Sequence, residues 1–282
     1  MARSRTPLRR FTRMGSRHLV AILASLVFVY PVLWILMAAI KPDVEIYRMP
    51  LQLFPSRPDF AGFQMILQRW PLFVFVANSL LYSFGAVLLS LAFALFAAYG
   101  LSRNEFAGKQ FTLILILVVQ MIPALVTVVP IYLLMRMIGL YDSRLGMVVL
   151  YSAMRIPWGV WIMVGFLNQI PRALDEAATI DGCSQLGILR RIIFPLALPG
   201  LASAAIFTFV GTWNEFAIAS IILRSTNNLS LPVATMTMIA ADPSDWRLVA
   251  ATASVNLLPV LAVFALLQRH IVAGLTRGAL KG

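Results

Sequence analysis

The chain has 282 residues, of which 60% are hydrophobic and 12% charged, and this composition excludes an ordinary soluble domain. Apolar stretches of about 20 residues indicate membrane-spanning helices, whereas a spanning barrel would show alternating segments of about 10 residues. The net charge of +12 would suggest nucleic-acid binding in a soluble protein, but six arginines directly precede the first apolar run, which is typical of cytoplasmic anchoring at a membrane.

The apolar runs predict an all-α polytopic membrane protein, with one transmembrane domain over residues 1–282 and six transmembrane helices. The predicted spans are residues 19–40, 72–99, 111–135, 145–167, 199–223 and 248–268. The first run is longer than the apolar core of a signal peptide and lacks a cleavage site, so it is interpreted as a retained helix. Lys and Arg are more frequent in the segments on the side of the termini, which predicts that both termini are cytoplasmic.

The segment 41–71 between the first two spans is rich in proline and aromatic residues. Two interpretations are open for it. It is either a structured extracytoplasmic docking surface or a connection that lies on the bilayer.

The segment 171–195, between the fourth and fifth spans, has a helical pattern. Pro171 favours the start of a helix and Gly182 its end, and Leu174, Ala177 and Ala178 would share one face. A second short helix is predicted from Ser184, ending at Pro195. Two such helices favour either a knob that docks into a partner or a pair that lies on the lipid headgroups.

This segment resembles the EAA motif of ABC importer permeases. Glu176-Ala177-Ala178 is followed by three residues, Gly182, nine residues and Ile192-Ile193-Phe194-Pro195, with Phe194 where the family usually has leucine. The resemblance implies that 171–195 is a cytoplasmic EAA coupling loop that docks into an ATP-hydrolysing subunit. The residues implied in coupling are Glu176, Ala177, Ala178, Asp181, Gly182, Ile192 and Pro195.

Four further segments resemble the carbohydrate-type branch of these permeases, which includes the second membrane subunit of the maltose transporter. They are Asn78-Ser79, Gly139–Asp142, Trp213–Glu215 and the tail from Gln268. The resemblance covers almost the whole chain, with a permease core at 72–268. It implies that the tail approaches the ATPase subunits through Arg269, Arg277, Lys281 and Gly282.

The resemblance also implies the partners and the location of the chain. The expected partners are a second homologous permease subunit, two ATPase subunits, an extracytoplasmic solute-binding protein, a carbohydrate substrate and the lipid bilayer, without nucleic acid. The expected location is the cytoplasmic membrane of a bacterium or archaeon.

The chain itself carries no signature of an enzyme. It has no G-x-x-x-x-G-K-[ST] sequence to hold nucleotide phosphates, so ATP and Mg are expected on the partner subunits. One cysteine and two histidines indicate no metal site and no cofactor in this chain. Two alternatives are a permease for another solute, such as a glycerol-phosphate-like anion, an amino acid or a peptide, and a secondary transporter. The latter would show inverted repeats and a carboxylate cluster, and neither is visible.

Polar residues within the spans are the candidates for a substrate pathway, because a charge at membrane depth costs about 2.5–3.5 kcal/mol on insertion scales. Arg155 would bind sugar hydroxyls or an anionic substituent, or else form a structural pair with Glu215 or with a neighbouring subunit. The pathway candidates are Asn78, Arg155, Trp213, Asn214 and Glu215. For Asn78, interhelical hydrogen bonding is the favoured interpretation. Pro123 and Pro130 predict a kinked, gating third span.

Overall fold

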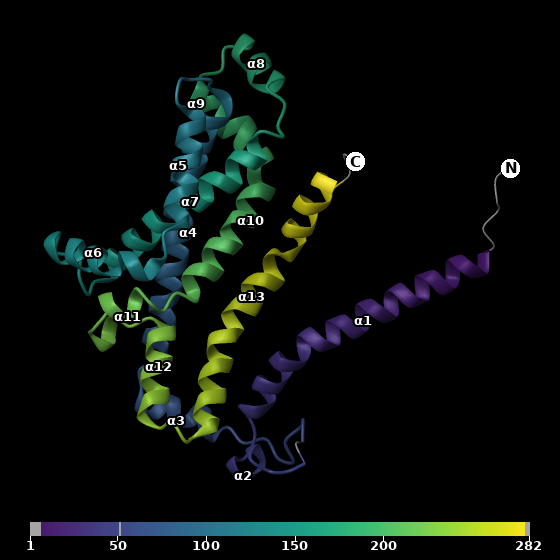
Figure 1. Cartoon of the computed structure of the whole chain (residues 1–282), viewed down its shortest axis with the longest axis vertical. Helices are drawn as coiled ribbons and strands as arrows, with labels where there is room; N and C mark the ends of the chain where they lie inside the picture. The colour runs from purple at the N-terminus through teal and green to yellow at the C-terminus, as the bar shows by residue number, and fades with distance from the viewer. Residues whose placement is uncertain (1–6, 51, 280–282) are drawn as a thin grey trace. The chain divides into compact units, whose positions relative to one another are not determined.

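The computed structural model describes residues 7–50 and 52–279, with side chains described for 18–50 and 52–266. Every regular element in this part of the chain is a helix, which confirms the all-α prediction (Figure 1). The elements are α1 (Pro7–Ala38), α2 (Asp43–Ile46), α3 (Ala61–Arg69), α4 (Leu72–Arg103), α5 (Lys109–Met121), α6 (Ala124–Met137), α7 (Arg144–Leu167), α8 (Ala173–Ile180), α9 (Gln185–Ile188), a π-helical turn (Leu189–Ile193), α10 (Phe194–Trp213), α11 (Ala219–Ile222), a 3-10 turn (Thr226–Asn228), α12 (Leu231–Ala241) and α13 (Trp246–Ala279).

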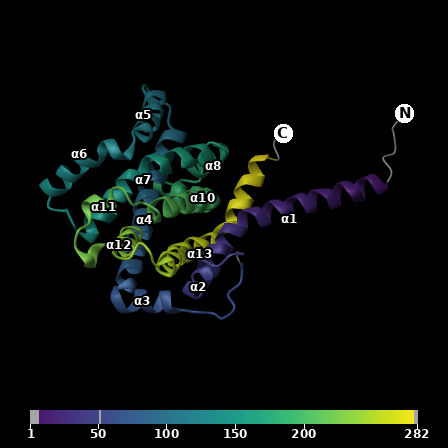
Figure 2. The same ribbon diagram turned by 60° about the horizontal axis from the view of Figure 1, so that its bottom comes forward.

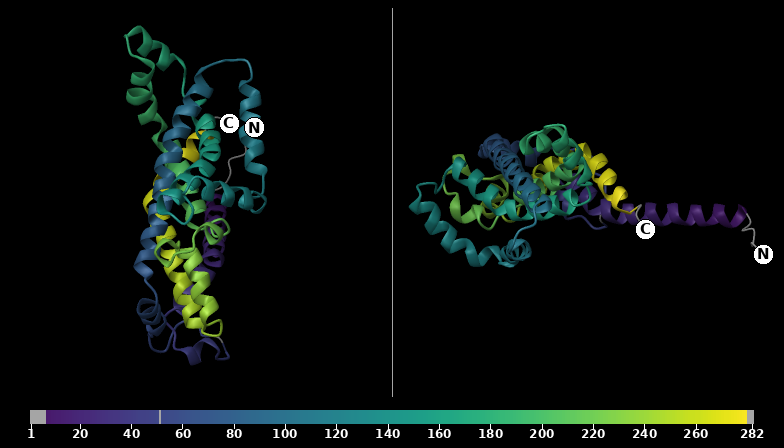
Figure 3. Two further views of the ribbon diagram at one scale, coloured as in Figure 1. Left: turned by 90° about the vertical axis from the view of Figure 1, so that its left-hand side faces the viewer. Right: turned by 90° about the horizontal axis from the view of Figure 1, so that it is seen from above.

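Five helices in the described part of the chain are long and apolar enough to cross a membrane, and there are six spans if α5 and α6 count as one. These two helices are bent by 94° relative to each other. The sharp turn between them is visible in Figure 3. Ile122 is extended there because the ring of Pro123 disfavours helical backbone at the preceding residue. Pro130, by contrast, lies inside α6. Gating by this bend stays a prediction.

The fifth span departs most from the expected boundaries. One helical segment runs continuously over Gln185–Trp213, so the prediction that a helix stops at Pro195 is wrong. The π-helical turn ends at Ile193, two residues before this proline, which lies in the first turn of α10. The regular helix then ends at Trp213, ten residues before the predicted end at Leu223.

The helix α1 begins at Pro7 and α13 extends to Ala279, so both are longer than the predicted spans 19–40 and 248–268. The apolar run marks only the part of a helix that lies in hydrocarbon, while the backbone continues as helix into charged sequence. Helical ends of this kind are not visible in hydropathy.

The chain divides into two compact units. The first contains the chain up to Trp70 together with Met238–Val255, and the second contains Pro71–Thr237 and the chain from Asn256. The helices α12 and α13 therefore contribute to both. The segment 171–195 and all five pathway candidates belong to the second unit.

The second unit is built on α4, α7 and α10, which pack against one another (Figure 2). Small residues allow these helices to approach closely, as is usual in membrane bundles. A Cβ atom added at Gly159 of α7 would lie 2.9 Å from the Cβ of Ala94 in α4, and one at Gly200 of α10 would lie 2.5 Å from the ring of Phe166. The three helices form a rigid scaffold for the loops at their ends.

The first unit contains the segment between the first two spans. Glu45 accepts hydrogen bonds from the backbone N–H and the hydroxyl of Ser56, and the Tyr47 hydroxyl donates to the carbonyl of Ser244 at 2.8 Å. The segment is thus folded over most of its length, with α2 and α3 inside it. Whether it docks a partner or lies on lipid stays open.

Candidate functional site

The helix α8 forms the tip of the loop between α7 and α10. Asp175 and Glu176 in its first turn favour the positive end of the helix dipole. After Asp181 the chain turns at Gly182, whose φ of +80° is readily adopted by glycine, so the predicted end of the helix is found there. The predicted start at Pro171 lies two residues before the observed first residue, Ala173.

Only one side of α8 faces the helix bundle. Ala178 is buried, whereas Leu174 and Ala177, which were expected to share its face, are exposed. Glu176 and Asp181 are also exposed, and Ile180 is the most exposed large apolar residue of the loop, at 87%. We call the exposed set Glu176, Ala177 and Ile180 the outward face of α8.

The second helix of the loop, α9, is a single turn that leads into the fifth span. The hydroxyl of Ser184 accepts a hydrogen bond from the backbone N–H of Gly187 at 3.2 Å, which caps the turn as expected. Leu189 and Ile193 are buried, Ile192 is half-buried and Leu186 is exposed. The apolar side of this helix therefore packs inward along most of its length.

Ala178 belongs to a continuous apolar core, the loop core, at this end of the second unit. Its neighbours there include Leu101 at the end of α4, Leu167 at the end of α7, and Ile188 and Ile193 at the start of the fifth span. Because the loop packs on the ends of two spans, it is an integral part of the bundle.

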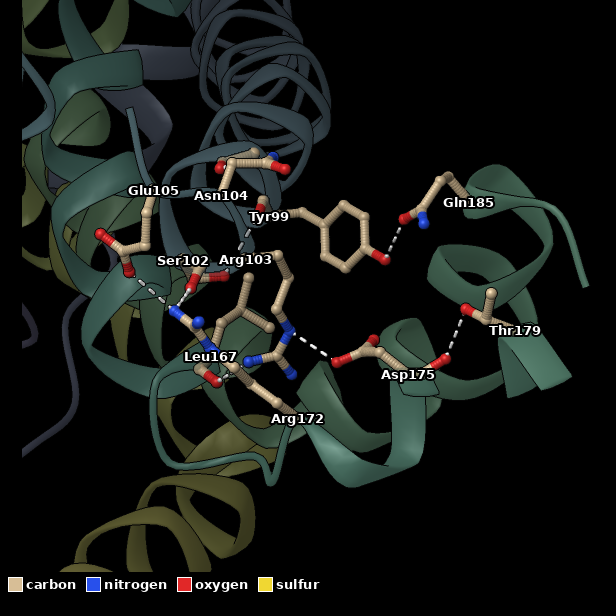
Figure 4. Close-up of polar contacts among 11 residues, drawn as sticks. Tyr99, Ser102, Arg103, Asn104, Glu105, Leu167, Arg172, Asp175, Thr179 and Gln185 are labelled. Atoms are coloured by element: carbon tan, nitrogen blue, oxygen red, sulfur yellow. Dashed lines mark hydrogen bonds and ion pairs between the residues drawn. The ribbon is translucent and has the colours of Figure 1, made fainter. Parts of the chain in front are cut away.

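A buried ion pair fixes the first turn of α8 to the end of α4. The Nε atom of Arg103 lies 2.8 Å from Oδ2 of Asp175, and the two side chains are only 9% and 15% exposed (Figure 4). The Nη1 atom of Arg103 also donates to the carbonyl of Leu167 at 3.2 Å. One guanidinium thus joins α4, α7 and α8.

A second set of charges lies beside this pair and is more exposed. The Nη2 atom of Arg172 donates to the carbonyl of Ser102 at 3.0 Å and to Oε1 of Glu105 at 2.9 Å (Figure 4). The Nζ atom of Lys109 lies 3.0 Å from the same Oε1. Hydrogen bonds from Lys109 and Arg172 hold the pKa of the Glu105 carboxyl below its usual range. Exposed pairs of this kind contribute little to stability.

Sequence reasoning missed Arg103, Arg172 and Glu105 as partners of the loop, and it assigned Asp175 only to the helix dipole. The available signal was a cluster of charges at the end of the second span, but no spacing rule connects it to a loop about 70 residues later. Of the implied coupling residues, Pro195 is exposed on α10. The side chains of Arg269 and Arg277, as well as Lys281 and Gly282, lie outside the described residues.

The pathway candidates Arg155, on α7, and Glu215, in the segment after α10, make separate contacts. The Nε atom of Arg155 donates to the hydroxyl of Thr212 at 3.2 Å. Glu215 accepts hydrogen bonds from the Tyr151 hydroxyl at 2.7 Å and from the backbone N–H groups of Ile218 and Ala219 at 2.8 and 3.0 Å. The structural pair considered for Arg155 and Glu215 is not formed within this chain.

The remaining pathway candidates differ in exposure. Trp213 is buried, stacks on Phe209 and donates to the carbonyl of Asn256 at 3.0 Å. Asn214 is exposed and donates to the carbonyl of Val210 in its own helix. Substrate contact by these residues stays a prediction.

Asn78 belongs to a polar cluster at the opposite end of α4 from the loop. Its amide nitrogen donates to the carbonyls of Asn227 and Leu229 at 2.8 and 3.0 Å. The same segment is held by Asp142, which accepts hydrogen bonds from the backbone N–H groups of Arg224 and Ser225 and from the hydroxyl of Ser225. These contacts tie α4 and the α6–α7 turn to the segment before α12.

The carboxylate of Asp142 makes this cluster sensitive to acid. Partial burial raises the pKa of Asp142, but hydrogen bonds from Arg224, Ser225 and Asn228 outweigh this effect, so the pKa lies below its usual range. A lowered pKa means that the stabilisation is complete above the unfolded-state pKa of about 3.9 and is lost as the pH falls through the folded-state pKa.

We therefore expect Asp142→Asn to lower the thermal unfolding temperature at pH 6, and to lower it less at pH 3, which is below the unfolded-state pKa of about 3.9, so that part of the stabilisation is already lost. The measurement is thermal unfolding of both proteins in detergent over this pH range. A difference in unfolding temperature that is the same at both pH values would contradict the prediction. Asp242→Asn, which removes a carboxylate bonded only to nearby Ser244, is the matched control.

Comparison with known proteins places this arrangement in a family. The model of the family described as "Binding-protein-dependent transport system inner membrane component" matches residues 90–277. The sulfoquinovosyl glycerol transport system permease protein SmoH of Agrobacterium fabrum is 31% identical over 90% of this chain and 89% of its own length. The diacetylchitobiose uptake system permease protein DasC of Streptomyces coelicolor is 31% identical over 94% of this chain and 96% of its own length.

A solved structure supports the fold. A chain of a bacterial ABC transporter involved in the import of the acidic polysaccharide alginate is 24% identical and aligns with a TM-score of 0.78, covering 96% of this chain and all of that chain. At this level of identity the likeness concerns the fold alone.

Proposed function

Because this chain belongs to the family of binding-protein-dependent transport system inner membrane components, we propose that it forms the translocation pathway of an ATP-driven carbohydrate importer and couples it to ATP hydrolysis through α8. The cargo is proposed from the named relatives, whose transport systems take up a sulfoquinovosyl glycerol and diacetylchitobiose. The chain is the transport subunit of this importer.

The single observation that carries the coupling role is the contrast between the two sides of α8. The inward side is fixed by the buried pair of Arg103 and Asp175 and by Ala178 in the loop core. The outward face exposes Ile180 and Glu176 on the same helix. An exposed apolar residue on a firmly anchored helix fits a docking element for a protein partner, because docking a pre-ordered element costs little conformational entropy.

The proposed partners follow from this assignment. Two ATPase subunits would receive α8 and its counterpart from a second homologous permease subunit, and they would bind the ATP and Mg. An extracytoplasmic solute-binding protein would deliver the cargo on the opposite side. Both termini would then be cytoplasmic, on the side of α8, and the tail residues Arg269, Arg277, Lys281 and Gly282 would approach the ATPases.

In the proposed mechanism, closure of the ATPase subunits on nucleotide moves α8, and the spans switch the cavity from inward-facing to outward-facing. Nucleotide drives this switch only to the extent that it binds the two states with different affinity. The α5–α6 bend and the early end of α10 at Trp213 are the irregular points of the bundle at which the spans would adjust.

A second candidate function is import of an anionic cargo, and the observation that favours it is the environment of Arg155. In the described part of the chain its guanidinium has one hydrogen bond, to Thr212, and no carboxylate lies within 4 Å of it. A carboxylate or sulfonate on the cargo would supply the missing acceptors, as bidentate arginine contacts commonly do.

The experiment that tests the function is purification of the tagged chain in mild detergent, followed by measurement of ATPase activity in the eluate. The native chain is compared with a deletion of 176–182. We expect an ATPase with the native chain and none with the deletion, and a subsequent uptake screen with neutral and acidic oligosaccharides then separates the two cargo classes. A native chain that elutes alone and still moves solute into vesicles would identify a secondary transporter.

A further inference from the structure

The contacts between α8 and the end of α4 consist of two kinds of charged pair. Arg103 and Asp175 are nearly buried, whereas Arg172 and Glu105 are 51% and 69% exposed. Water competes with the exposed pair for its hydrogen bonds, so this pair is free to exchange partners. Glu105 is also paired with Lys109. The buried pair has no such alternative: among the described side chains, neither Arg103 nor Asp175 has another opposite charge within 4 Å.

The geometry of the buried pair also links three elements at one point. Arg103 and Asp175 attract each other as buried opposite charges without a hydrogen bond between them. The Nε atom of Arg103 meets Asp175 on α8, and its Nη1 atom meets the carbonyl of Leu167 at the end of α7. Displacement of α8 would separate a buried charge from its counter-charge, so α8 and the ends of α4 and α7 are constrained to move together.

The apolar contacts of α8 do not impose this constraint. Ala178 is a small side chain that belongs to the same apolar core as Leu101, Leu167 and Ile188, and hydrophobic burial has no preferred direction. Hydrogen bonding of Tyr99 to Gln185 holds α9, not α8, and is exposed. The buried electrostatic link between α8 and the spans is therefore the Arg103–Asp175 ion pair, beside which Arg172 donates a hydrogen bond to the carbonyl of Ser102.

We propose that Arg103 is the positioning residue through which movement of α8 reaches the membrane spans, with Asp175 as its obligatory partner. This inference rests on the proposed coupling function. It assigns transmission to the inward side of α8, whereas the EAA residues on the outward face make the contact with the ATPase. Arg172 and Glu105 then have no part in transmission.

The test measures the distance between α8 and α4 in the purified complex by pulsed electron paramagnetic resonance. Spin labels are placed at Thr179→Cys on α8 and Phe96→Cys on α4, which are both exposed and lie outside the outward face of α8, after Cys183→Ser removes the single native cysteine. The distance is recorded without nucleotide and with MgATP and vanadate. In the otherwise native complex we expect one narrow distribution that nucleotide does not shift, because the two helices move as one body.

In Arg103→Gln and Asp175→Asn we expect loss of the narrow distribution and a nucleotide-dependent shift, because α8 follows the ATPase while α4 stays behind. The charge swap Arg103→Asp with Asp175→Arg should restore the native behaviour, which a merely local packing role would not predict. Glu105→Gln, which breaks the exposed pair, and Arg172→Gln, which also removes the hydrogen bond to the carbonyl of Ser102, are the matched controls and should behave like the native complex.

Three results would overturn the inference. They are a native-like distance distribution in Arg103→Gln, a nucleotide-dependent distance shift in Arg172→Gln, and a charge-swap variant that does not recover the native distance distribution. If Arg103→Gln does not assemble, Arg103→Lys keeps the charge without the guanidinium. If both Arg103→Lys and the charge-swap variant lose the ATPase, the pair is needed for docking of the ATPase, and this result would also overturn the inference. Absence of an ATPase from the native preparation would instead overturn the proposed function itself.

Discussion

Replacement of Ile180 by aspartate is expected to release the ATPase subunits from the complex. Ile180 is 87% exposed at the end of α8, so the substitution leaves the packing of this chain unchanged. In a complex, burial of an isoleucine side chain contributes about 1.5–3 kcal/mol, and a carboxylate in its place must also be desolvated. A loss of at least about 2 kcal/mol corresponds to roughly 30-fold weaker association or more. The measurement is the amount of ATPase that co-purifies over a range of salt and detergent concentrations.

The conservative control is Ile180→Leu, which keeps the apolar contact and should retain the ATPase. Glu176→Lys, which reverses an exposed charge on the same face, should also abolish uptake while the chain remains in the membrane. Full ATPase recovery with Ile180→Asp, or normal uptake with Glu176→Lys, would show that the outward face of α8 is not the docking surface.

The residues that could be identified from the sequence are those whose role is local. Gly182 ends α8 because its backbone adopts φ of +80°, and Ser184 caps α9 through a neighbouring N–H. Such roles depend on residues within one helical turn and leave a pattern of fixed spacing. Arg103 and Asp175 leave no such pattern, because their contact forms only when the second and fourth spans bring their ends together.

The two prolines at Pro123 and Pro195 show the same limit for the fold. Hydropathy predicts the number of spans because the bilayer imposes a minimum length of apolar sequence. It does not predict whether a proline within an apolar run interrupts the helix. At Pro123 the third span is interrupted, and α5 and α6 meet there at a bend of 94°. Pro195 instead lies within a continuous helix, shortly after a π-helical turn. The difference lies in the backbone hydrogen bonding of the neighbouring turns, which packing decides.

The exposed fraction of Ile180 is likewise a property of the folded loop. By sequence it is one more apolar residue in an amphipathic helix, and Leu174 and Ala177 were expected to share one face with Ala178. In the structure, Ala178 and the ion-paired Asp175 face the bundle, whereas Leu174 and Ala177 are exposed. The side of α8 that faces the bundle thus depends on contacts with residues far away in the sequence.

Glu215→Ala is expected to lower the stability of the chain by roughly 3 kcal/mol or more, because it removes the acceptor of three hydrogen bonds and leaves two backbone N–H groups unpaired. Glu215 lies where α10 has ended at Trp213, and its carboxylate caps the start of α11 while holding Tyr151 of α7. The expected fall in unfolding temperature is roughly 6–12 °C, measured by thermal unfolding in detergent.

The neighbouring Asn214→Ala is the control for this substitution, since Asn214 is exposed and bonds only within its own helix, and it should change stability by no more than about 0.5 kcal/mol. A double-mutant cycle with Tyr151→Phe isolates the contact between α7 and the segment after α10, with an expected coupling of about 1.5–3 kcal/mol. Glu215→Gln separates structure from transport, because the amide keeps the size of the side chain and one acceptor. A stable Glu215→Gln variant that fails to transport would assign Glu215 to the pathway. If stability and transport fall together in Glu215→Gln, the role of the carboxylate is structural. It then stabilises the segment between α10 and α11 through its hydrogen bonds to Ile218 and Ala219.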